Sequence, residues 1–300
     1  MRVMFLGSKR VGLRCLEAML QVDASSIVAA VTLDDGADVR SVRKEFWKLS
    51  ANRSVLLHAV SRRADVKPLI ERHRPDLCIV VGWYWLISDA LIAAVRNGFI
   101  GIHFSLLPRY RGSSPLVWTM LNGETETGVS MFTLVKDVDA GDIWGQRRVV
   151  IEKDEYIGTV LAKLEDRAVD LIKTVFPALL AGTATATPQD HSRATFCSPR
   201  TPGDGVIDWH SDSETVLRVI RSQSRPYPGA FTTVNERRLT IWRASRGYTA
   251  SMSPGTVARQ RGVAAVVCGD NKSILADEVE CDGVNGSLDQ VLDPSIMRLG

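Results

Sequence analysis

Short runs of apolar and β-branched residues recur through the first third of the chain, and helical patterns separate them. Continuous runs of this kind are typical of strands that are buried on both faces of a sheet. Strands that alternate with helices predict a parallel sheet with right-handed crossover connections and helices on both faces. We expect strands at residues 3–6, 27–33, 55–60, 77–81 and 99–103, and helices at 11–20, 66–73 and 89–95.

The second half of the chain changes its pattern twice. Two further strands are expected at 129–135 and 144–151, and an amphipathic helix at 158–180. Residues 181–188 are small and polar and end in proline, which is typical of a linker. After about residue 205, one helix (214–222) precedes short β-like runs at 230–234, 239–244, 255–258, 263–268 and 273–276. Runs of this length separated by Gly, Pro and Asn predict a small β-barrel.

The fold class that follows is α/β. We expect a Rossmann-like, mostly parallel sheet with helices on both faces at 1–185, a linker at 186–204, and a small OB-like β-barrel subdomain at 205–300. The glycines after the first strand, Gly7 and Gly12, lack the G-x-G-x-x-G spacing of a dinucleotide loop. They predict only a strand-to-helix turn.

The composition of the chain argues against several classes of protein. An apolar content of 45% with 24% charged residues is typical of a soluble globular protein. The net charge is only +3, and Lys and Arg are scattered rather than gathered as in a nucleic-acid binder. No apolar run reaches the roughly 18 to 20 residues of a membrane helix, and the N-terminal run is too short for a signal peptide. Five widely spaced cysteines without a Cys-x-x-Cys motif predict reduced thiols in the cytoplasm and no metal site.

A histidine and an aspartate are the first candidates for chemistry. His103 ends one predicted strand, and Asp139 lies on the loop between two later strands. Ligands of parallel sheets bind beyond the carboxyl ends of the strands. An imidazole donates or accepts protons near neutral pH, and a carboxylate beside it stabilises the imidazolium and fixes its orientation. The residues alone leave open that His103 bonds to the backbone and Asp139 caps a turn.

Three segments resemble one enzyme family. Residues 103–112, 121–128 and 138–141 closely resemble the formyltransferases that use 10-formyltetrahydrofolate, which include methionyl-tRNA, glycinamide ribonucleotide and amino-sugar formyltransferases. Residues 204–209, 226–231 and 239–242 resemble the C-terminal barrel of the longer members. The resemblance therefore covers nearly the whole chain, and implies a catalytic domain at 1–185 and a formyltransferase-type barrel at 205–300.

The resemblance implies a reaction and a binding site. An amine would attack the formyl carbon carried on N10 of the co-substrate 10-formyltetrahydrofolate. His103 would assist the developing oxyanion and proton transfer, and Asp139 would support His103 and relay protons. The folate would contact three strand-end segments, which are Trp85, Leu86 and Ile87; Ser105, Leu106, Leu107 and Pro108; and Val135, Lys136, Asp137 and Val138. For Trp85 the alternative is an aromatic residue of the core.

Two positions depart from the family pattern. Gly101 stands where members normally carry an Asn whose amide donates to the oxyanion, and losing one such donor typically lowers the rate by about 10² to 10³. This leaves three alternatives: another group replaces the donor, turnover is lost while folate still binds, or the space admits a different acceptor or reaction. Ser113 stands where several amino-sugar enzymes carry Arg, which leaves a contact to folate or sugar nucleotide there unsupported.

The amine that accepts the formyl group is the part of the predicted function that the sequence specifies least. Methionyl-tRNA enzymes carry a long basic insertion after the second strand, whereas residues 32–38 here are acidic and short. Residues 122–128 and 204–210 most resemble the domain that formylates UDP-4-amino-arabinose. We therefore expect a small-molecule amine, an amino sugar on a nucleotide, with no nucleic-acid or membrane partner. The alternatives are a methionyl-tRNA formyltransferase and a folate-binding homologue with lost or altered activity. The barrel would orient substrate or form a homodimer.

Overall fold

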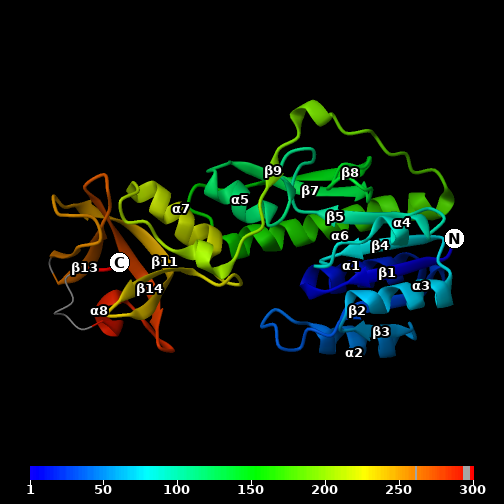
Figure 1. Cartoon of the computed structure of the whole chain (residues 1–300), viewed down its shortest axis with the longest axis horizontal. Helices are drawn as coiled ribbons and strands as arrows, with labels where there is room; N and C mark the ends of the chain where they lie inside the picture. Colours follow the sequence, from blue (N-terminus) through cyan, green and yellow to red (C-terminus); the bar gives the residue numbers. More distant parts are fainter. Residues whose placement is uncertain (261, 293–297) are drawn as a thin grey trace. The chain divides into compact units, whose positions relative to one another are not determined.

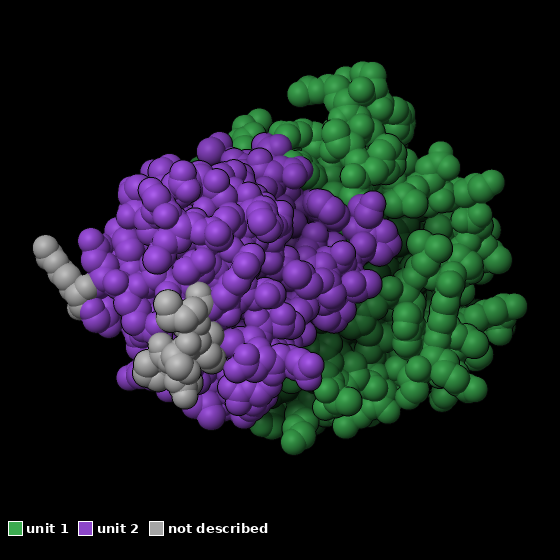
Figure 2. Space-filling view, turned by 60° about the vertical axis from the view of Figure 1, so that its left-hand side comes forward, with its two compact units in different colours: residues 1–115, 126–150, 162–197 green, residues 116–125, 151–161, 198–300 purple. Residues whose placement is uncertain are grey.

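The computed structural model describes residues 1–260, 262–292 and 298–300 of the chain. These residues divide into two compact units that exchange stretches of sequence (Figure 2). Unit 1 comprises residues 1–115, 126–150 and 162–197. Unit 2 comprises residues 116–125, 151–161 and 198–300. The chain therefore passes between the units several times.

Unit 1 is built on a mostly parallel sheet, which confirms the predicted fold class. Within the described residues this sheet has seven strands in the order β3-β2-β1-β4-β5-β7-β8 (Figure 1). The first five strands pair in parallel, and β7 and β8 pair antiparallel at one edge. The strands are β1 (Val3–Gly7), β2 (Ile27–Leu33), β3 (Leu57–Val60), β4 (Leu77–Val81), β5 (Phe99–His103), β7 (Glu126–Thr133) and β8 (Ile143–Val150).

Helices connect and cover these strands. Apolar residues of α3 (Val66–His73) and α4 (Asp89–Ala93) pack with the side chains that β1, β2 and β4 present to one face of the sheet. Helix α1 (Lys9–Asp23) contacts β1 and β4. An ion pair of 2.6 Å between Arg10 and the buried Glu165 joins α1 to α6 (Ile157–Ala181), which runs through both units.

One helix of unit 1 had no signal in the hydrophobic pattern. Helix α2 (Arg43–Arg53) buries only Phe46 among its residues, and its remaining positions are polar or partly exposed. A helix without an apolar stripe gives no 3.6-residue periodicity in the sequence. This is why the pattern left residues 43–53 unassigned.

Unit 2 contains an antiparallel sheet, as expected for the small barrel subdomain. Its strands follow the order β10-β11-β14-β13-β12, and β15 pairs with β14. The apolar core includes Trp209, whose indole N–H donates to Thr232 Oγ1 at 3.1 Å. The elements are α5 (Pro115–Leu121), α7 (Ser213–Gln223), β10 (Ala230–Val234), β11 (Arg237–Thr249), β12 (Val257–Gln260), β13 (Val263–Val267), β14 (Lys272–Cys281), β15 (Val284–Gly286) and α8 (Leu288–Val291).

Among the helices of the described residues, we find none whose length and hydropathy would let it cross a membrane.

Candidate active site

The predicted pair of His103 and Asp139 comes together at the end of β5. His103 Nδ1 lies 3.6 Å from Asp139 Oδ2, and the two side chains are 11% and 21% exposed. His103 Nε2 lies 2.7 Å from the carbonyl oxygen of Tyr110. Because a carbonyl oxygen only accepts hydrogen bonds, Nε2 carries a proton. The Nδ1 atom of the same ring faces the Asp139 carboxylate.

The backbone around Asp139 holds its carboxylate in place. Asp139 has a φ of +49°, a left-handed conformation that is uncommon outside glycine. Its Oδ2 accepts a hydrogen bond of 2.7 Å from the backbone N–H of Gly112. The side-chain amide of Gln189 donates to the carbonyl oxygens of Asp139 and Gly141 at 2.8 and 2.7 Å. The carboxylate is therefore fixed by contacts far apart in sequence.

Residues 187–197, which we call the strap, supply these distant contacts. Thr187 forms an isolated bridge with Ile143, and β9 (Phe196–Cys197) pairs in parallel with β6 (Arg111–Gly112). Thr195 Oγ1 accepts from the backbone N–H of Tyr110, the residue whose carbonyl meets His103. The strap thus contacts both loops that position the pair. It falls within the range expected as a linker, and belongs to unit 1.

A buried arginine completes this arrangement. Arg111 is 4% exposed, and its guanidinium donates to Gln189 Oε1 at 2.7 Å and approaches His191 Nδ1 at 3.0 Å. Arg111 thereby orients the Gln189 amide, whose nitrogen is left to donate to the Asp139 loop. Sequence reasoning missed Gln189 and His191, because their role depends on contacts across 48 to 80 residues.

The cysteine in the strap does not supply a nucleophile. Burial, together with the negative charge of Asp139, raises the pKa of the Cys197 thiol to about 11. A thiol with such a pKa stays protonated at neutral pH, and the thiolate is the reactive form. The groups that can move protons here are therefore the imidazole and the carboxylate.

A cavity of about 350 Å³ adjoins Asp139 and collects several predicted folate residues. Leu86, Ile87, Val135, Lys136 and Val138 line it, together with Phe132, Leu134 and Asp139. Asp137 is exposed and is not among its lining residues. The mixture of aliphatic walls and loop backbone suits a flat polar heterocycle.

Trp85 lies at a neighbouring cavity. That cavity is larger, about 560 Å³, and shares Leu86 and Ile87 with the first. Trp85 meets Trp83 edge to face at 5.3 Å and packs on the core cluster of the sheet. It therefore contacts both the core and a cavity wall.

The segment after His103 turns away from these two cavities. Ser105 is buried, its hydroxyl donates to Arg109 O at 2.7 Å, and its carbonyl accepts from Ser130 Oγ at 2.7 Å. Leu106, Leu107 and Pro108 line a third cavity of about 470 Å³. The structure thus divides the predicted folate residues between different cavities.

The space beside Gly101 is filled by apolar side chains. A Cβ atom at this position would lie 2.6 Å from Leu134 Cδ1 and 3.3 Å from Phe132 Cε1. Both residues also line the cavity next to Asp139. Where relatives are expected to place an amide, this chain therefore places the end of a leucine.

No cluster of three or more His, Cys, Asp or Glu side chains suited to a metal ion occurs in the part of the chain that the structure describes. The structure places an imidazole and a carboxylate, two groups able to transfer protons, beside a cavity.

Comparison with known families identifies the class. Residues 1–176 match the formyl transferase family, and residues 200–285 match the formyl transferase C-terminal domain. The chain therefore belongs to the formyl transferase family, as its motifs indicated.

Solved structures share the fold at low sequence identity. The N-formyltransferase from Helicobacter canadensis, solved with folinic acid and dTDP-3-aminofucose, is 15% identical with a TM-score of 0.69, over 91% of this chain and 98% of that one. HypX from Aquifex aeolicus, solved with tetrahydrofolic acid, is 18% identical with a TM-score of 0.66, over 97% of this chain and 46% of that one. Methionyl-tRNA formyltransferase from Clostridium thermocellum is 19% identical with a TM-score of 0.60, over 82% of this chain and 93% of that one.

Proposed function

We propose that this protein transfers the formyl group of 10-formyltetrahydrofolate to the primary amine of a small molecule, an amino sugar on a nucleotide carrier. The observation that carries the proposal is the His103–Asp139 pair, held at 3.6 Å beside the cavity lined by Leu86, Ile87 and Val135. Family membership supports formyl transfer. The folinic acid and dTDP-3-aminofucose bound to the Helicobacter canadensis protein support the two substrate classes.

In this proposal each residue of the pair has a task. The amine nitrogen bonds to the formyl carbon, and the tetrahedral intermediate then breaks its bond to N10 of the folate. His103 stabilises the oxyanion and supplies the proton that N10 takes up. Asp139 accepts the proton that the attacking amine loses. The strap residue Gln189 holds Asp139 for this step through its backbone carbonyl.

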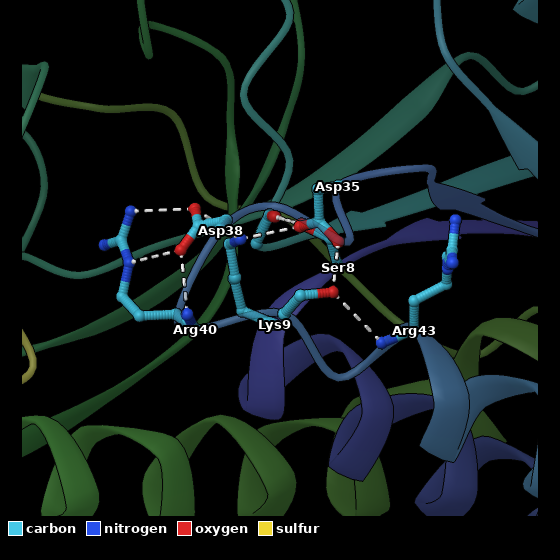
Figure 3. Close-up of polar contacts among 8 residues, drawn as sticks. Ser8, Lys9, Asp35, Asp38, Arg40 and Arg43 are labelled. Atoms are coloured by element: carbon cyan, nitrogen blue, oxygen red, sulfur yellow. Dashed lines mark hydrogen bonds and ion pairs between the residues drawn. The ribbon is translucent and has the colours of Figure 1, made fainter.

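The charges after β2 favour a small molecule over tRNA. Figure 3 shows Lys9 between two carboxylates, with Nζ 2.6 Å from Asp35 and 2.7 Å from Asp38. Burial raises the pKa of Asp38, but the hydrogen bonds from Lys9 and Arg40 outweigh it and hold this pKa at about 2. Cations that are neutralised in this way do not supply the phosphate contacts on which tRNA affinity depends.

A second candidate is a folate-binding homologue with lost or altered activity. The observation that favours it is Gly101, because the side chains of Leu134 and Phe132 fill the space where an oxyanion donor would stand. Such a protein would bind folate in the cavity next to Asp139 and turn over little or no amine.

Release of tetrahydrofolate from 10-formyltetrahydrofolate tests the proposal. UDP- and dTDP-linked amino sugars and methionyl-tRNA serve as acceptors, and the sugars should give release while the tRNA should not. His103→Ala should lower kcat by about 10² to 10⁴, because it removes the acid–base group. Tetrahydrofolate affinity should change little, and the exposed His210 provides the control His210→Ala.

An unchanged rate in His103→Ala would contradict the mechanism. Tight tetrahydrofolate binding without release for any acceptor would favour the folate-binding homologue. Release with methionyl-tRNA alone would transfer the assignment to the tRNA enzymes.

A further inference from the structure

The ring of His103 is held by the loop that directly follows it in sequence. His103 Nε2 lies 2.7 Å from the carbonyl oxygen of Tyr110, at the far end of residues 104–110, which we call the His103 loop. Inside this loop, the hydroxyl of Ser105 donates to the carbonyl oxygen of Arg109 at 2.7 Å. The position of the imidazole therefore depends on the conformation of the His103 loop.

The strap holds the second half of the His103 loop. Thr195 Oγ1 accepts from the backbone N–H of Tyr110 at 2.8 Å. The backbone N–H of Thr195 donates to the carbonyl oxygen of Pro108 at 3.3 Å. The first half of the loop is anchored by different residues, which belong to the sheet.

Ser130 provides the first of these anchors. It is fully buried on β7 and pairs with His103 in the strand register. Its hydroxyl donates to the carbonyl oxygen of Ser105 at 2.7 Å and accepts from the backbone N–H of Leu107 at 3.1 Å. A hydroxyl has only one hydrogen to donate, and Ser130 uses it for Ser105. A further hydrogen bond to Ser130 Oγ therefore requires a donor.

Gln146 of β8 is that donor. It pairs with Ser130 in the register, and its Nε2 lies 2.7 Å from Ser130 Oγ and 2.9 Å from the carbonyl oxygen of Leu107. A side-chain amide carries two N–H groups, and these two acceptors use both of them. The backbone of the buried Leu107 is thus fixed at its N–H by Ser130 and at its C=O by Gln146. Gln146 itself is not among the residues that line the cavity next to Asp139.

We propose that Gln146 is a positioning residue for His103, which acts through the His103 loop and without contact to the substrates. The inference rests on the proposed function, because that function gives His103 its task. Without the two donors of Gln146, the buried carbonyl oxygen of Leu107 loses a hydrogen bond, and a shift of the loop is the way to regain one from water. Such a shift moves Tyr110 and the imidazole that contacts it, and a displacement of about 1 Å at a catalytic group can lower the rate about 10²-fold.

Gln146→Leu removes both donors and keeps a side chain of similar size. In the assay of tetrahydrofolate release, its kcat should be about 10- to 100-fold lower than that of the wild type, because the imidazole is no longer held in place. The calorimetric affinity for tetrahydrofolate should stay within a few-fold, because Gln146 does not line the cavity next to Asp139. Val149→Ala is the control for stability. Val149 is buried on the same strand, so this variant should lower the melting temperature without lowering kcat.

Gln146→Glu tests the donors themselves. A carboxylate has no hydrogen to donate, whereas a protonated carboxyl group has one. The ratio of its kcat to that of the wild type should therefore rise as the pH falls. The same ratio for Gln146→Leu should not depend on pH, because a leucine side chain does not titrate.

Nuclear magnetic resonance of the full chain with isotope-labelled histidine measures the position of His103 without any turnover. The chain has five histidines, and the signals of His103 are assigned by their absence in His103→Ala. The Nε2–H signal should be visible in the wild type and in Val149→Ala. In Gln146→Leu it should weaken or vanish through exchange with water, because the bond to Tyr110 is no longer maintained.

In an active enzyme, an unchanged kcat in Gln146→Leu would overturn the inference, and so would a fall in kcat with an unchanged His103 signal. An equal loss of kcat in Val149→Ala would reduce the effect to stability and overturn it as well. A His103 signal that depends on Gln146 in a chain that transfers no formyl group would contradict the proposed function and support the positioning of His103 by Gln146.

Discussion

At the scale of single residues, Gly101 is matched by Leu134, whose side chain fills the space beside it. A side chain at 101 would collide with Leu134 Cδ1, the mobile end of a leucine. Gly101→Asn should therefore lower the free energy of unfolding by about 1–3 kcal/mol through overpacking. With Leu134→Ala in the same chain, the Asn should be accommodated, and urea unfolding should show a coupling of at least about 1 kcal/mol between the two substitutions.

The same variants report on catalysis. Relative to Leu134→Ala alone, the double variant should raise kcat at least tenfold, because one oxyanion donor is typically worth about 10² to 10³ in rate. Additive stability effects would contradict the steric account. An unchanged kcat with the expected coupling would mean that another group of this chain already serves the oxyanion.

At the scale of elements, the strap should determine how well Asp139 is held. Gln189→Glu keeps an acceptor for Arg111 but replaces the nitrogen that donates to the carbonyls of Asp139 and Gly141. We expect kcat to fall by about 10- to 100-fold, since loss of positioning carries costs of this order. The KM for 10-formyltetrahydrofolate should stay within a few-fold, because the cavity next to Asp139, where we propose that folate binds, is lined by other residues.

Gln290→Glu is the control for this change. Gln290 uses its side-chain oxygen to accept from the backbone N–H of Ser287, and a carboxylate can do the same. A steady-state assay in which both variants lose the same activity, or neither does, would refute the positioning role of Gln189.

Local sequence signals account for the sheet but not for the strap. The strands β2, β4 and β5 begin and end at the predicted residues, because each is a largely apolar and largely buried run. The contact of His103 with Asp139 was expected from the family resemblance and does not follow from strand order. β7 runs antiparallel to β5, so the loop that carries Asp139 starts near Ile100, at the opposite end of β5 from His103. Gln189 has no such signal, because its partners Asp139 and Arg111 lie 50 and 78 residues away. Helix α2 was missed for a different reason. It is a local element, but it has no apolar stripe that the sequence pattern could reveal.

At the scale of the whole molecule, Tyr156 joins an early segment of unit 2 to its sheet. Its hydroxyl donates to Ala244 O at 3.0 Å and accepts from Ala244 N at 2.9 Å. The register of β11 against β14 shifts at Ala244, where a bulge leaves backbone groups without ladder partners. Tyr156→Phe should therefore destabilise unit 2 by about 1–3 kcal/mol, the penalty for unsatisfied buried polar groups.

Amide hydrogen exchange, followed separately in unit 1 and unit 2, tests this prediction. Protection should fall in β11 and β14, and tetrahydrofolate affinity, which we assign to unit 1, should not change. Tyr84→Phe is the control, because Tyr84 is half exposed in unit 1. Equal loss of protection in both units would show that Tyr156 does not act on unit 2 in particular.

The exchange of sequence between the units has a consequence for synthesis on the ribosome. Unit 1 is complete once residue 197 has emerged, whereas residues 116–125 and 151–161 belong to unit 2 and wait for the last third of the chain. Tyr156 meets Ala244 only after 88 more residues have been translated, which takes roughly 4 to 18 seconds at bacterial and eukaryotic rates. During that interval the nascent chain contains a complete unit 1 and two segments of unit 2 that still lack their packing partners. A chaperone that binds nascent chains would encounter this form.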